Sequence, residues 1–573
     1  MGSFPDKGVS ERITGHAVPF IIFLAAFLIR SAFLLQLKAS PFDPLILDGE
    51  YYYKWASGIA GGDLLGGGIY YGLPLYPHFL GLIFFIFGKN ILAAQVINAL
   101  LDSASCVLLY SIGKKLFGNV TGFLAAMMLA FYNMSLFFDA NLDSTSLSVF
   151  LNLTTLAVVI SLWERPAPLK WAITGLLAGI TALSNASVLL FMLFFCVFSA
   201  ASLKHESRKN VITGIAILFI SAMSVFTVTA ARNYAAGKDF VPVTCHSGIT
   251  FYAGNNPGSI GSFYLPYELG RGVVNTRSAS RNIAEKRTGK KLKPSEISSF
   301  WFSEGVRFIR ENPRKYAVLL LKKLYLFWWG KEIPEGIPLS VVRKYSDVLN
   351  APLISFSLIA PLACIGMFVF LPGSGGGKKI LYIFIISSIA SSLVYFVNSR
   401  YKMTASPVLI LFSAAAVLFL LRNCAAKKYM VFIAGVAGSV FLFYFFNRDI
   451  ASHREDVTFN QLGVSYAKNK KFDEAEKAFK KALSLNPAHP MAHYNLGTAY
   501  MQQGKTAAAV GEFKEAIRLN PGYVNAYNNL GTIYHRSGRY GEAIRYFEIS
   551  MELDPHQENI KRALLDLKKS ARE

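Results

Sequence analysis

The fold is decided first by the stretch Ala17-Val-Pro-Phe-Ile-Ile-Phe-Leu-Ala-Ala-Phe-Leu-Ile-Arg30-Ser-Ala-Phe-Leu-Leu-Gln-Leu37, which is apolar along almost its whole length. A helix of about 20 apolar residues crosses the hydrocarbon core of a bilayer. The stretch is long, contains Arg30 and is not followed by a small-residue cleavage site, so we expect a membrane span and not a cleaved signal peptide.

Similar apolar windows recur outward from this stretch. Of the 573 residues, 53% are hydrophobic and only 16% are charged, whereas a soluble domain carries about 25% charge. The sequence therefore predicts an all-α, polytopic membrane bundle of about eleven spans. We place the others near 91–113, 120–137, 143–163, 172–186, 187–203, 211–231, 351–371, 380–397, 404–421 and 429–446.

The net charge of +23 is mainly a topology signal. Residues 455–573 hold 17 basic and 14 acidic residues, so about +20 belongs to the membrane part. Lys and Arg gather in alternate short loops, so with eleven spans they all fall on one side of the membrane, which predicts a cytoplasmic N-terminus. The first loop (38–90), a large loop (232–350) and the C-terminal part then lie on the non-cytoplasmic side. This pattern gives no reason to expect a nucleic-acid partner.

A 34-residue period runs through the C-terminal part. Leu462-Gly463 returns as Leu496-Gly497 and Leu530-Gly531, and the positions of Tyr466, Ala475, Phe479 and Pro487 return in the same way. This is the tetratricopeptide pattern, which builds a helical solenoid. We expect repeats at 456–489, 490–523 and 524–557 and a capping helix at 559–572.

The concave face of such a solenoid usually binds a peptide or partner protein. Asparagines in register can clamp a peptide backbone through their carboxamides, or can simply be solvated polar residues. Both interpretations stay open for Asn460, Asn495, Asn528 and Asn529.

Two carboxylates follow the first span. Asp48-Gly49-Glu50 opens an aromatic segment, Tyr51-Tyr-Tyr-Lys54-Trp55, which we expect to lie in the membrane interface. A carboxylate at that depth can act as a general base toward a hydroxyl group. It can also cap the interfacial helix.

Several motifs resemble the C-type glycosyltransferases, in particular the branch with protein O-mannosyltransferases and the bacterial aminoarabinose transferase of lipid A. They are the acidic motif after the first span, the aromatic helix and Tyr71-Gly-Leu-Pro-Leu-Tyr-Pro77. Weaker matches are Asn98-Ala-Leu-Leu, Tyr110 to Gly118, Gly175 to Asn185, Val241-Pro-Val, Gly254-Asn-Asn-Pro257, Glu311 to Tyr316 and Ser399-Arg-Tyr401. The resemblance covers residues 1–450.

The resemblance implies a transferase that uses a polyprenyl-phosphate-linked sugar and inverts the anomeric carbon. Asp48 matches the position of the family's catalytic carboxylate. Many mannosyltransferases have two adjacent acidic residues there, whereas this chain has Asp48 and Glu50 separated by Gly49, so the role of Glu50 stays open. The acceptor is a protein or an envelope glycan, and the repeats recruit it or a partner.

A departing lipid phosphate needs cations near the membrane surface. Arg400 and Tyr401 match a phosphate-contacting pair of the family, although Arg400 at a span end can also reach toward lipid head groups. The other substrate-binding candidates are Glu50, Tyr51, Tyr52, Lys54, Asp143 and Arg232. Lys54 can pair with Glu50 instead, Asp143 can cap a helix, and Asp139 is a further residue that can line the same cavity.

No metal site has a convincing ligand spacing, and the use of a divalent metal stays open. Two other functions also remain: an oligosaccharide ligase of the O-antigen type, working from basic and His residues of the large loop, and a non-enzymatic anchor that displays the repeats. From the resemblance to bacterial members we expect a bacterial inner membrane with the repeats in the periplasm.

Overall fold

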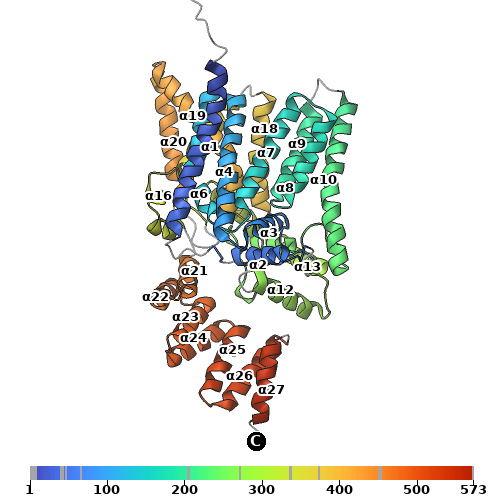
Figure 1. Cartoon of the computed structure of the whole chain (residues 1–573), viewed down its shortest axis with the longest axis vertical. Helices are drawn as coiled ribbons and strands as arrows, with labels where there is room; N and C mark the ends of the chain where they lie inside the picture. The colour runs from blue at the N-terminus through green and yellow to red at the C-terminus, as the bar shows by residue number, and fades with distance from the viewer. Residues whose placement is uncertain are drawn as a thin grey trace, which may run out of the picture.

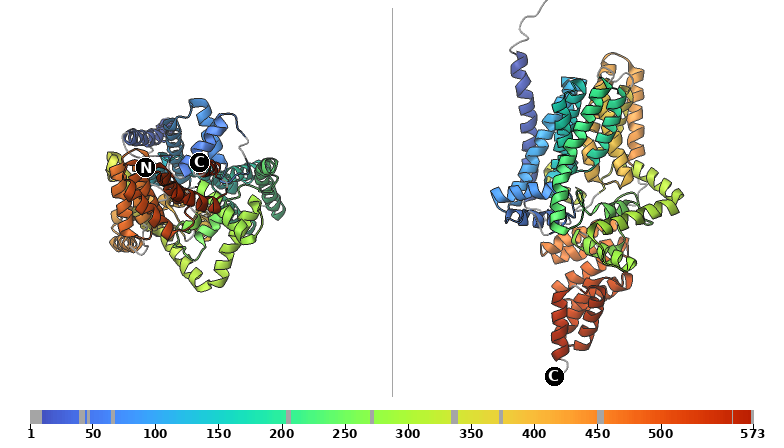
Figure 2. Two further views of the ribbon diagram at one scale, coloured as in Figure 1. Left: turned by 90° about the horizontal axis from the view of Figure 1, so that it is seen from below. Right: turned by 90° about the vertical axis from the view of Figure 1, so that its right-hand side faces the viewer.

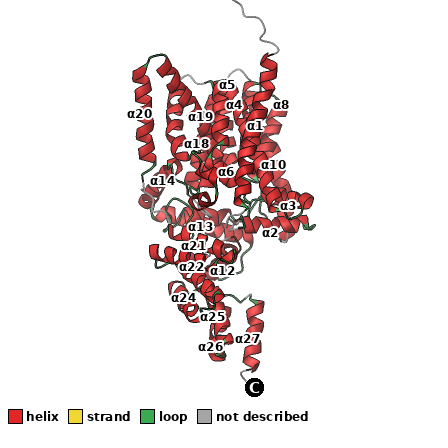
Figure 3. Cartoon of the chain, turned by 60° about the vertical axis from the view of Figure 1, so that its left-hand side comes forward, coloured by secondary structure: helices red, strands yellow, loops and turns green. Residues whose placement is uncertain are grey.

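The computed structural model of the chain describes residues 10–38, 44–45, 48–64, 68–202, 207–269, 273–333, 339–371, 375–448, 455–555 and 557–570. Within these ranges the chain is helical, and its extended backbone is limited to one isolated bridge between Tyr132 and Ile354 (Figure 3). The predicted all-α class is confirmed. A bundle of long helices stands at one end of the molecule and a solenoid hangs from the other (Figure 1).

The bundle contains a helix at each of the eleven predicted spans. It is formed by α1 (Ser10–Leu37), α4 (Ile91–Phe117), α5 (Asn119–Ala130), α6 (Asn133–Asp139), α7 (Thr145–Glu164), α8 (Pro168–Ala182), α9 (Ser187–Ser202), α10 (Arg208–Gly237), α17 (Phe356–Phe370), α18 (Gly376–Val394), α19 (Ser399–Ala425) and α20 (Tyr429–Phe446). Seven of them, α1, α4, α7, α10, α18, α19 and α20, are long and apolar enough to cross a membrane. The predicted spans at 120–137, 172–186, 187–203 and 351–371 coincide with shorter helices.

Helix α19 is the centre of the bundle. Its most apolar 18 residues are 78% buried, against 6% for the neighbouring α20, so α20 presents nearly its whole surface to lipid. Small residues let helices approach closely, as is usual in membranes. A Cβ atom at Gly175 of α8 would lie 2.1 Å from the carbonyl oxygen of Leu218 in α10, so this pair of helices packs backbone to backbone.

A buried ionic cluster ties three bundle helices together. Arg30 of α1 is fully buried and pairs with Asp102 of α4 at 2.6 Å and with Asp139 of α6 at 2.9 Å. Ser135 and Ser146 donate further hydrogen bonds to these two carboxylates. Breaking such a pair from one side typically costs about 3–5 kcal/mol, so Arg30 holds the first span in place.

Short and amphipathic helices form a layer between the bundle and the solenoid (Figure 2). They are α2 (Asp48–Ala60), α3 (Leu75–Phe87), α11 (Ser247–Gly254), η1 (Tyr267–Leu269), α12 (Val273–Thr288), α13 (Pro294–Glu311), α14 (Pro313–Trp328), α15 (Leu339–Val342), η2 (Arg343–Tyr345) and α16 (Asp347–Asn350). This layer lies at the end of the bundle opposite the first residues of α1.

The solenoid consists of three helix pairs and a final helix. These are α21 (Glu455–Lys468) with α22 (Phe472–Leu485), α23 (Pro490–Gln502) with α24 (Thr506–Leu519), α25 (Val524–Arg536) with α26 (Tyr540–Leu553), and α27 (Glu558–Ser570).

The repeated glycine of the solenoid has a packing reason. A Cβ atom at Gly463, Gly497 or Gly531 would lie 2.4, 2.8 or 2.5 Å from the ring of a buried phenylalanine in the paired helix. These phenylalanines are Phe479, Phe513 and Phe547, each at most 3% exposed. The glycine of the Leu-Gly signature therefore leaves the space into which this ring fits.

Candidate active site

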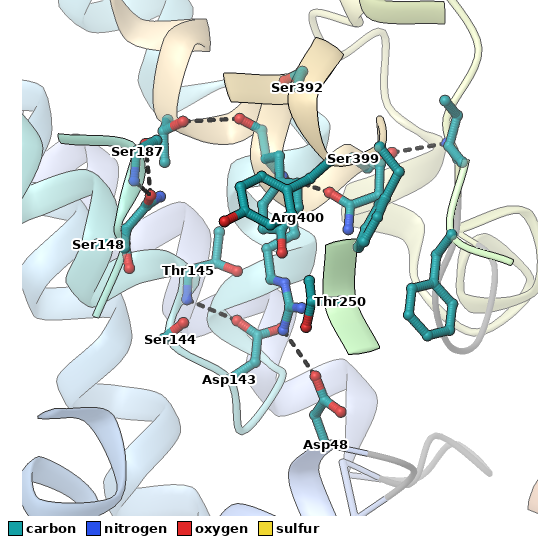
Figure 4. A pocket seen from close by; sticks show the side chains of 18 of the residues that line it. Asp48, Asp143, Ser144, Thr145, Ser148, Ser187, Thr250, Ser392, Ser399 and Arg400 are labelled. Carbon is teal, nitrogen blue, oxygen red and sulfur yellow. Dashed lines mark hydrogen bonds and ion pairs between the residues drawn. The ribbon is translucent and has the colours of Figure 1, made fainter. Parts of the chain in front are cut away.

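A cavity of about 840 Å³ opens where the bundle, the intermediate layer and the solenoid meet. Six of the predicted site residues line it: Asp48, Tyr51, Tyr52, Asp143, Arg400 and Tyr401. Their side chains come from α2, the turn before α7 and the first turn of α19 (Figure 4). Folding thus brings together candidates from three distant parts of the sequence.

The central contact of the cavity joins Asp48 and Arg400. Nη1 of Arg400 donates to Oδ2 of Asp48 at 2.9 Å, and the two side chains are 20% and 39% exposed. An ion pair this exposed is worth about 0–1 kcal/mol. A stronger anion, such as a phosphate, can therefore draw the guanidinium away from Asp48 at little cost.

Asp143 is a second carboxylate beside the same guanidinium. Figure 4 shows Arg400 pointing between Asp48 and Asp143. Oδ1 of Asp143 accepts a hydrogen bond at 2.8 Å from the backbone N–H of Thr145, the first residue of α7. Burial raises the pKa of Asp143, while Arg400 opposes that shift. Both roles considered from sequence, a cavity residue and a helix-end cap, are occupied by this one side chain.

Gly49 explains the departure from two adjacent acidic residues. Gly49 is buried, and a Cβ atom there would lie 1.9 Å from the carbonyl oxygen of Pro44. No side chain fits at this position, so a second carboxylate next to Asp48 is excluded by packing. The next acidic residue, Glu50, pairs with Lys54 at 2.7 Å, and this hydrogen bond lowers the pKa of Glu50.

The first turn of α19 is fixed at several points, which orients Arg400. The side chain of Asn398 caps the helix by accepting from the N–H of Tyr401 at 2.7 Å. The hydroxyl of Ser399 accepts from the N–H of Ile333 at 2.8 Å, and Nζ of Lys402 donates to the carbonyl of Trp329 at 2.6 Å. Arg400 therefore extends from a rigid helix start and not from a free loop.

Sequence reasoning missed His246 and Glu332, two of the titratable residues that line the cavity. His246 lines the wall with its ring 4.5 Å from that of Tyr71, and burial lowers its pKa to about 4. Glu332 also lines the cavity, and burial raises its pKa to about 7 against the opposing charges of Arg343 and Lys402. Neither residue lies in a motif, so only the fold reveals its position.

Four other candidates lie elsewhere. Glu50 and Lys54 pair on the outer side of α2, and Arg232 stacks 3.8 Å from the ring of Tyr70 and donates to the carbonyl of Gly68 at 2.6 Å. None of these three is among the cavity-lining residues that the structure describes. The expectation that Asp139 lines the cavity is wrong, because Asp139 is fully buried against Arg30.

The four asparagines of the solenoid contact their own neighbours. Asn495 donates to Asn460 at 2.9 Å, and Asn460 is only 3% exposed. Asn528 donates to Gln557 at 2.6 Å, and Asn529 approaches the hydroxyl of Tyr494 at 3.5 Å. Peptide binding by these residues stays a prediction, and for Asn460 it would require displacement of a neighbouring side chain.

The described residues form no cluster of three or more His, Cys, Asp or Glu side chains with metal-binding geometry. Between Asp48 and Asp143 the positive charge is supplied by Arg400. The side chains at this point thus fit a salt bridge and not a metal-ligand set.

Comparisons with known proteins agree with both parts of the chain. Residues 73–228 match a family model described as dolichyl-phosphate-mannose-protein mannosyltransferase. Residues 460–524 and 496–558 match a tetratricopeptide repeat model. The first match includes Asp143 but neither Asp48 nor Arg400, so the roles of those two rest on their geometry. No curated protein matches the chain.

Two solved structures illustrate the similarity. One is the oligosaccharyltransferase AglB of Archaeoglobus fulgidus in complex with an inhibitory peptide and a dolichol-phosphate, at 14% identity and a TM-score of 0.41, covering 80% of this chain and 59% of that one. The other is the first repeat domain of human RPAP3, at 26% identity and a TM-score of 0.20, covering 20% and 92%.

The match of residues 73–228 to an enzyme family favours a glycosyltransferase over a non-enzymatic anchor. The chain is a membrane glycosyltransferase that matches dolichyl-phosphate-mannose-protein mannosyltransferases over residues 73–228 and carries tetratricopeptide repeats.

Proposed function

We propose that this enzyme transfers one sugar from a polyprenyl-phosphate donor to a protein or envelope-glycan acceptor on the non-cytoplasmic side, with inversion. The observation that carries the proposal is the contact between Asp48 and Arg400 in the cavity. This contact supports a pairing of the proposed base, Asp48, with the proposed phosphate-binding cation, Arg400, in a space large enough for a sugar and part of its acceptor.

The reaction is a single displacement. The acceptor hydroxyl gives its proton to Asp48 while its oxygen forms a bond to the anomeric carbon. The bond between that carbon and the phosphate oxygen breaks, and its electron pair leaves with the polyprenyl phosphate. Arg400 stabilises the charge that develops on the departing phosphate, and donor binding first frees Asp48 from its ion pair.

The sidedness is also part of the proposal. The repeats lie at the end of the bundle opposite the start of α1, and residues of the first repeat line the cavity. The Lys and Arg distribution favours a cytoplasmic N-terminus. This topology supports a transferase domain at 1–450 in a bacterial inner membrane and periplasmic repeats at 456–573. In this arrangement the repeats recruit the acceptor or a partner protein.

A ligase of the O-antigen type fits the cavity less well. Such an enzyme would work from basic and His residues of the large loop, of which His246 and Lys322 line the cavity. The ion pair of the cavity, Asp48 with Arg400, instead comes from outside that loop. Burial lowers the pKa of His246 to about 4, so His246 is neutral at pH 7 and offers no positive charge to a phosphate.

The test uses the full-length enzyme in lipid nanodiscs with dolichyl-phosphate mannose and, in parallel, undecaprenyl-phosphate aminoarabinose. Consumption of one donor, with a product of the opposite anomeric configuration by NMR, is expected. A product that retains the donor configuration would exclude the single displacement. Mass spectrometry of envelope proteins and glycolipids with and without the gene then identifies the acceptor by the sugar mass that is lost.

A further inference from the structure

The first repeat helix forms part of the cavity wall. Val457, Thr458 and Gln461 of α21 line the same cavity as Asp48 and Arg400, and Gln461 is only 8% exposed. Each later repeat packs on the repeat before it. The first repeat has no predecessor, and the membrane part of the chain covers its open face instead.

The contact continues along one side of α21. Residues 458, 461 and 468 follow the spacing of a single helix face. Nζ of Lys468 donates to the carbonyl of Leu45 at 2.7 Å and lies 3.8 Å from Oε2 of Glu50. These two partners flank Asp48 in the sequence, so Lys468 holds the chain on both sides of the proposed base.

A second contact fixes the orientation of the helix. The hydroxyl groups of Tyr466 in α21 and Tyr345 in η2 are 3.1 Å apart. The membrane part therefore holds α21 at two separate places, α2 and η2. These two contacts therefore fix the direction of the α21 axis as well as its point of attachment.

The two ends of the cavity differ in chemistry. Toward the bundle the lining includes Leu189 and Leu193 of α9 and Val394 of α18, which are 41%, 56% and 44% exposed on the outer surface of the bundle. That end suits a polyprenyl chain entering from lipid. At the other end the wall is the hydroxyl and carboxamide of α21, and Figure 4 places Asp48 well away from Ser392 of α18.

We propose that α21 is the acceptor-side wall of the active site and that the acceptor is a polypeptide. Thr458 and Gln461 contact the peptide while its hydroxyl reaches Asp48, and Lys468 is a positioning residue for the N-terminal turn of α2. Neutral side chains of this kind hydrogen-bond peptide groups whatever the peptide sequence. The inference rests on the proposed function, whose proton transfer to Asp48 and departure of the polyprenyl phosphate it leaves unchanged.

The acceptor role is tested with dolichyl-phosphate mannose as donor and a pool of synthetic Ser- and Thr-containing octapeptides as acceptor. Gln461→Ala and Thr458→Ala should each raise the KM for peptide about fivefold or more and leave the KM for donor within twofold. Gln502→Ala, at an exposed position of the second repeat, is the matched control. Peptide KM values equal to wild type in both variants would overturn the proposal and leave the proposed function standing.

Other outcomes separate the acceptor classes. Donor hydrolysis by the wild type with no glycosylated peptide would overturn the polypeptide acceptor alone. Failure to consume any polyprenyl-phosphate sugar would overturn the proposed function, and the acceptor wall with it.

Lys468 has a test that needs no substrate. Lys468→Met should raise hydrogen exchange in the peptides that cover Leu45 to Tyr52 about tenfold. Lys477→Met, which removes an exposed lysine from the same repeat, should leave that exchange unchanged. Equal exchange in the two variants would show that Lys468 does not position α2.

Discussion

The membrane site and the repeat domain of this enzyme are built over very different distances along the chain. Asp48 and Arg400 lie 352 residues apart and meet through a single ion pair. In the repeats, each glycine meets its phenylalanine in the next helix, and the same contact occurs three times. The site therefore depends on the whole bundle, whereas a repeat depends mainly on its neighbours.

This difference separates two kinds of sensitivity. A change in the cavity should reduce chemistry without unfolding, because Asp48 and Arg400 are partly exposed and contribute little to stability. A change in the repeat core should reduce stability without direct effect on chemistry. At α21, where the two regions share a wall, we expect both effects.

The largest expected effect is that of Asp48→Asn. This substitution removes the proposed base with little change in volume, and transfer should fall about 10³-fold, measured as initial rates in nanodiscs. Asp63→Asn, in the loop that follows α2, is the control and should keep full activity. Full transfer by Asp48→Asn would contradict the assignment and direct attention to Asp143, the other carboxylate at the guanidinium.

Local patterns explain why the fold was largely predictable. The 34-residue period locates each repeat because the contact behind it is local. The ring of Phe479 packs against Gly463 within a single helix pair. Hydropathy located a helix at every predicted span, but not the lengths of these helices. The window at 351–371 includes apolar residues before α17, and the window at 120–137 runs across the break between α5 and α6.

The sequence predicted several residues of the site, but not which of them contact each other. Asp48 and Arg400 stood out because their positions match the catalytic carboxylate and the phosphate-contacting pair of the family that the sequence resembles. Their pairing depends on how α2 meets α19, which no local pattern encodes. His246, Glu332 and Gln461 were missed for the same reason, since each is brought to the cavity by contacts far away in sequence.

The next largest effect compares Phe479→Ala with Phe547→Ala. Both remove a ring that is almost fully buried, and each should lower the free energy of unfolding of the repeats by about 3–5 kcal/mol. Limited proteolysis and thermal unfolding measure this loss.

Only Phe479→Ala should also reduce transfer, because Phe479 supports Gly463 in the helix that lines the cavity. Phe547 lies in the third repeat, and its loss should leave α21 folded. An equal loss of transfer in both variants would mean that the repeats unfold as one unit, contrary to the comparison.

A smaller effect is expected for Arg400→Lys. Lysine keeps the charge but loses the planar fork that binds a phosphate through two hydrogen bonds. The KM for donor should rise about 10- to 100-fold, while expression and thermal stability stay unchanged. Arg422→Lys, an exposed position in the last turn of the same helix, is the control. A donor KM unchanged by Arg400→Lys would show that the donor phosphate does not bind at this end of α19.

The smallest effect is a pH dependence that belongs to the site and not to the repeats. Burial raises the pKa of Glu332 to about 7, above its ordinary value, so the folded protein binds a proton that the unfolded chain has already lost. The contribution of Glu332 to the free energy of unfolding should therefore fall as pH rises, by about 1.4 kcal/mol between pH 6 and 8. Glu332→Gln should abolish this part of the decline in thermal unfolding scans at the two pH values, and the exposed Glu311→Gln should not. A Glu332→Gln profile identical to that of wild type would show that Glu332 is already ionised in the folded cavity.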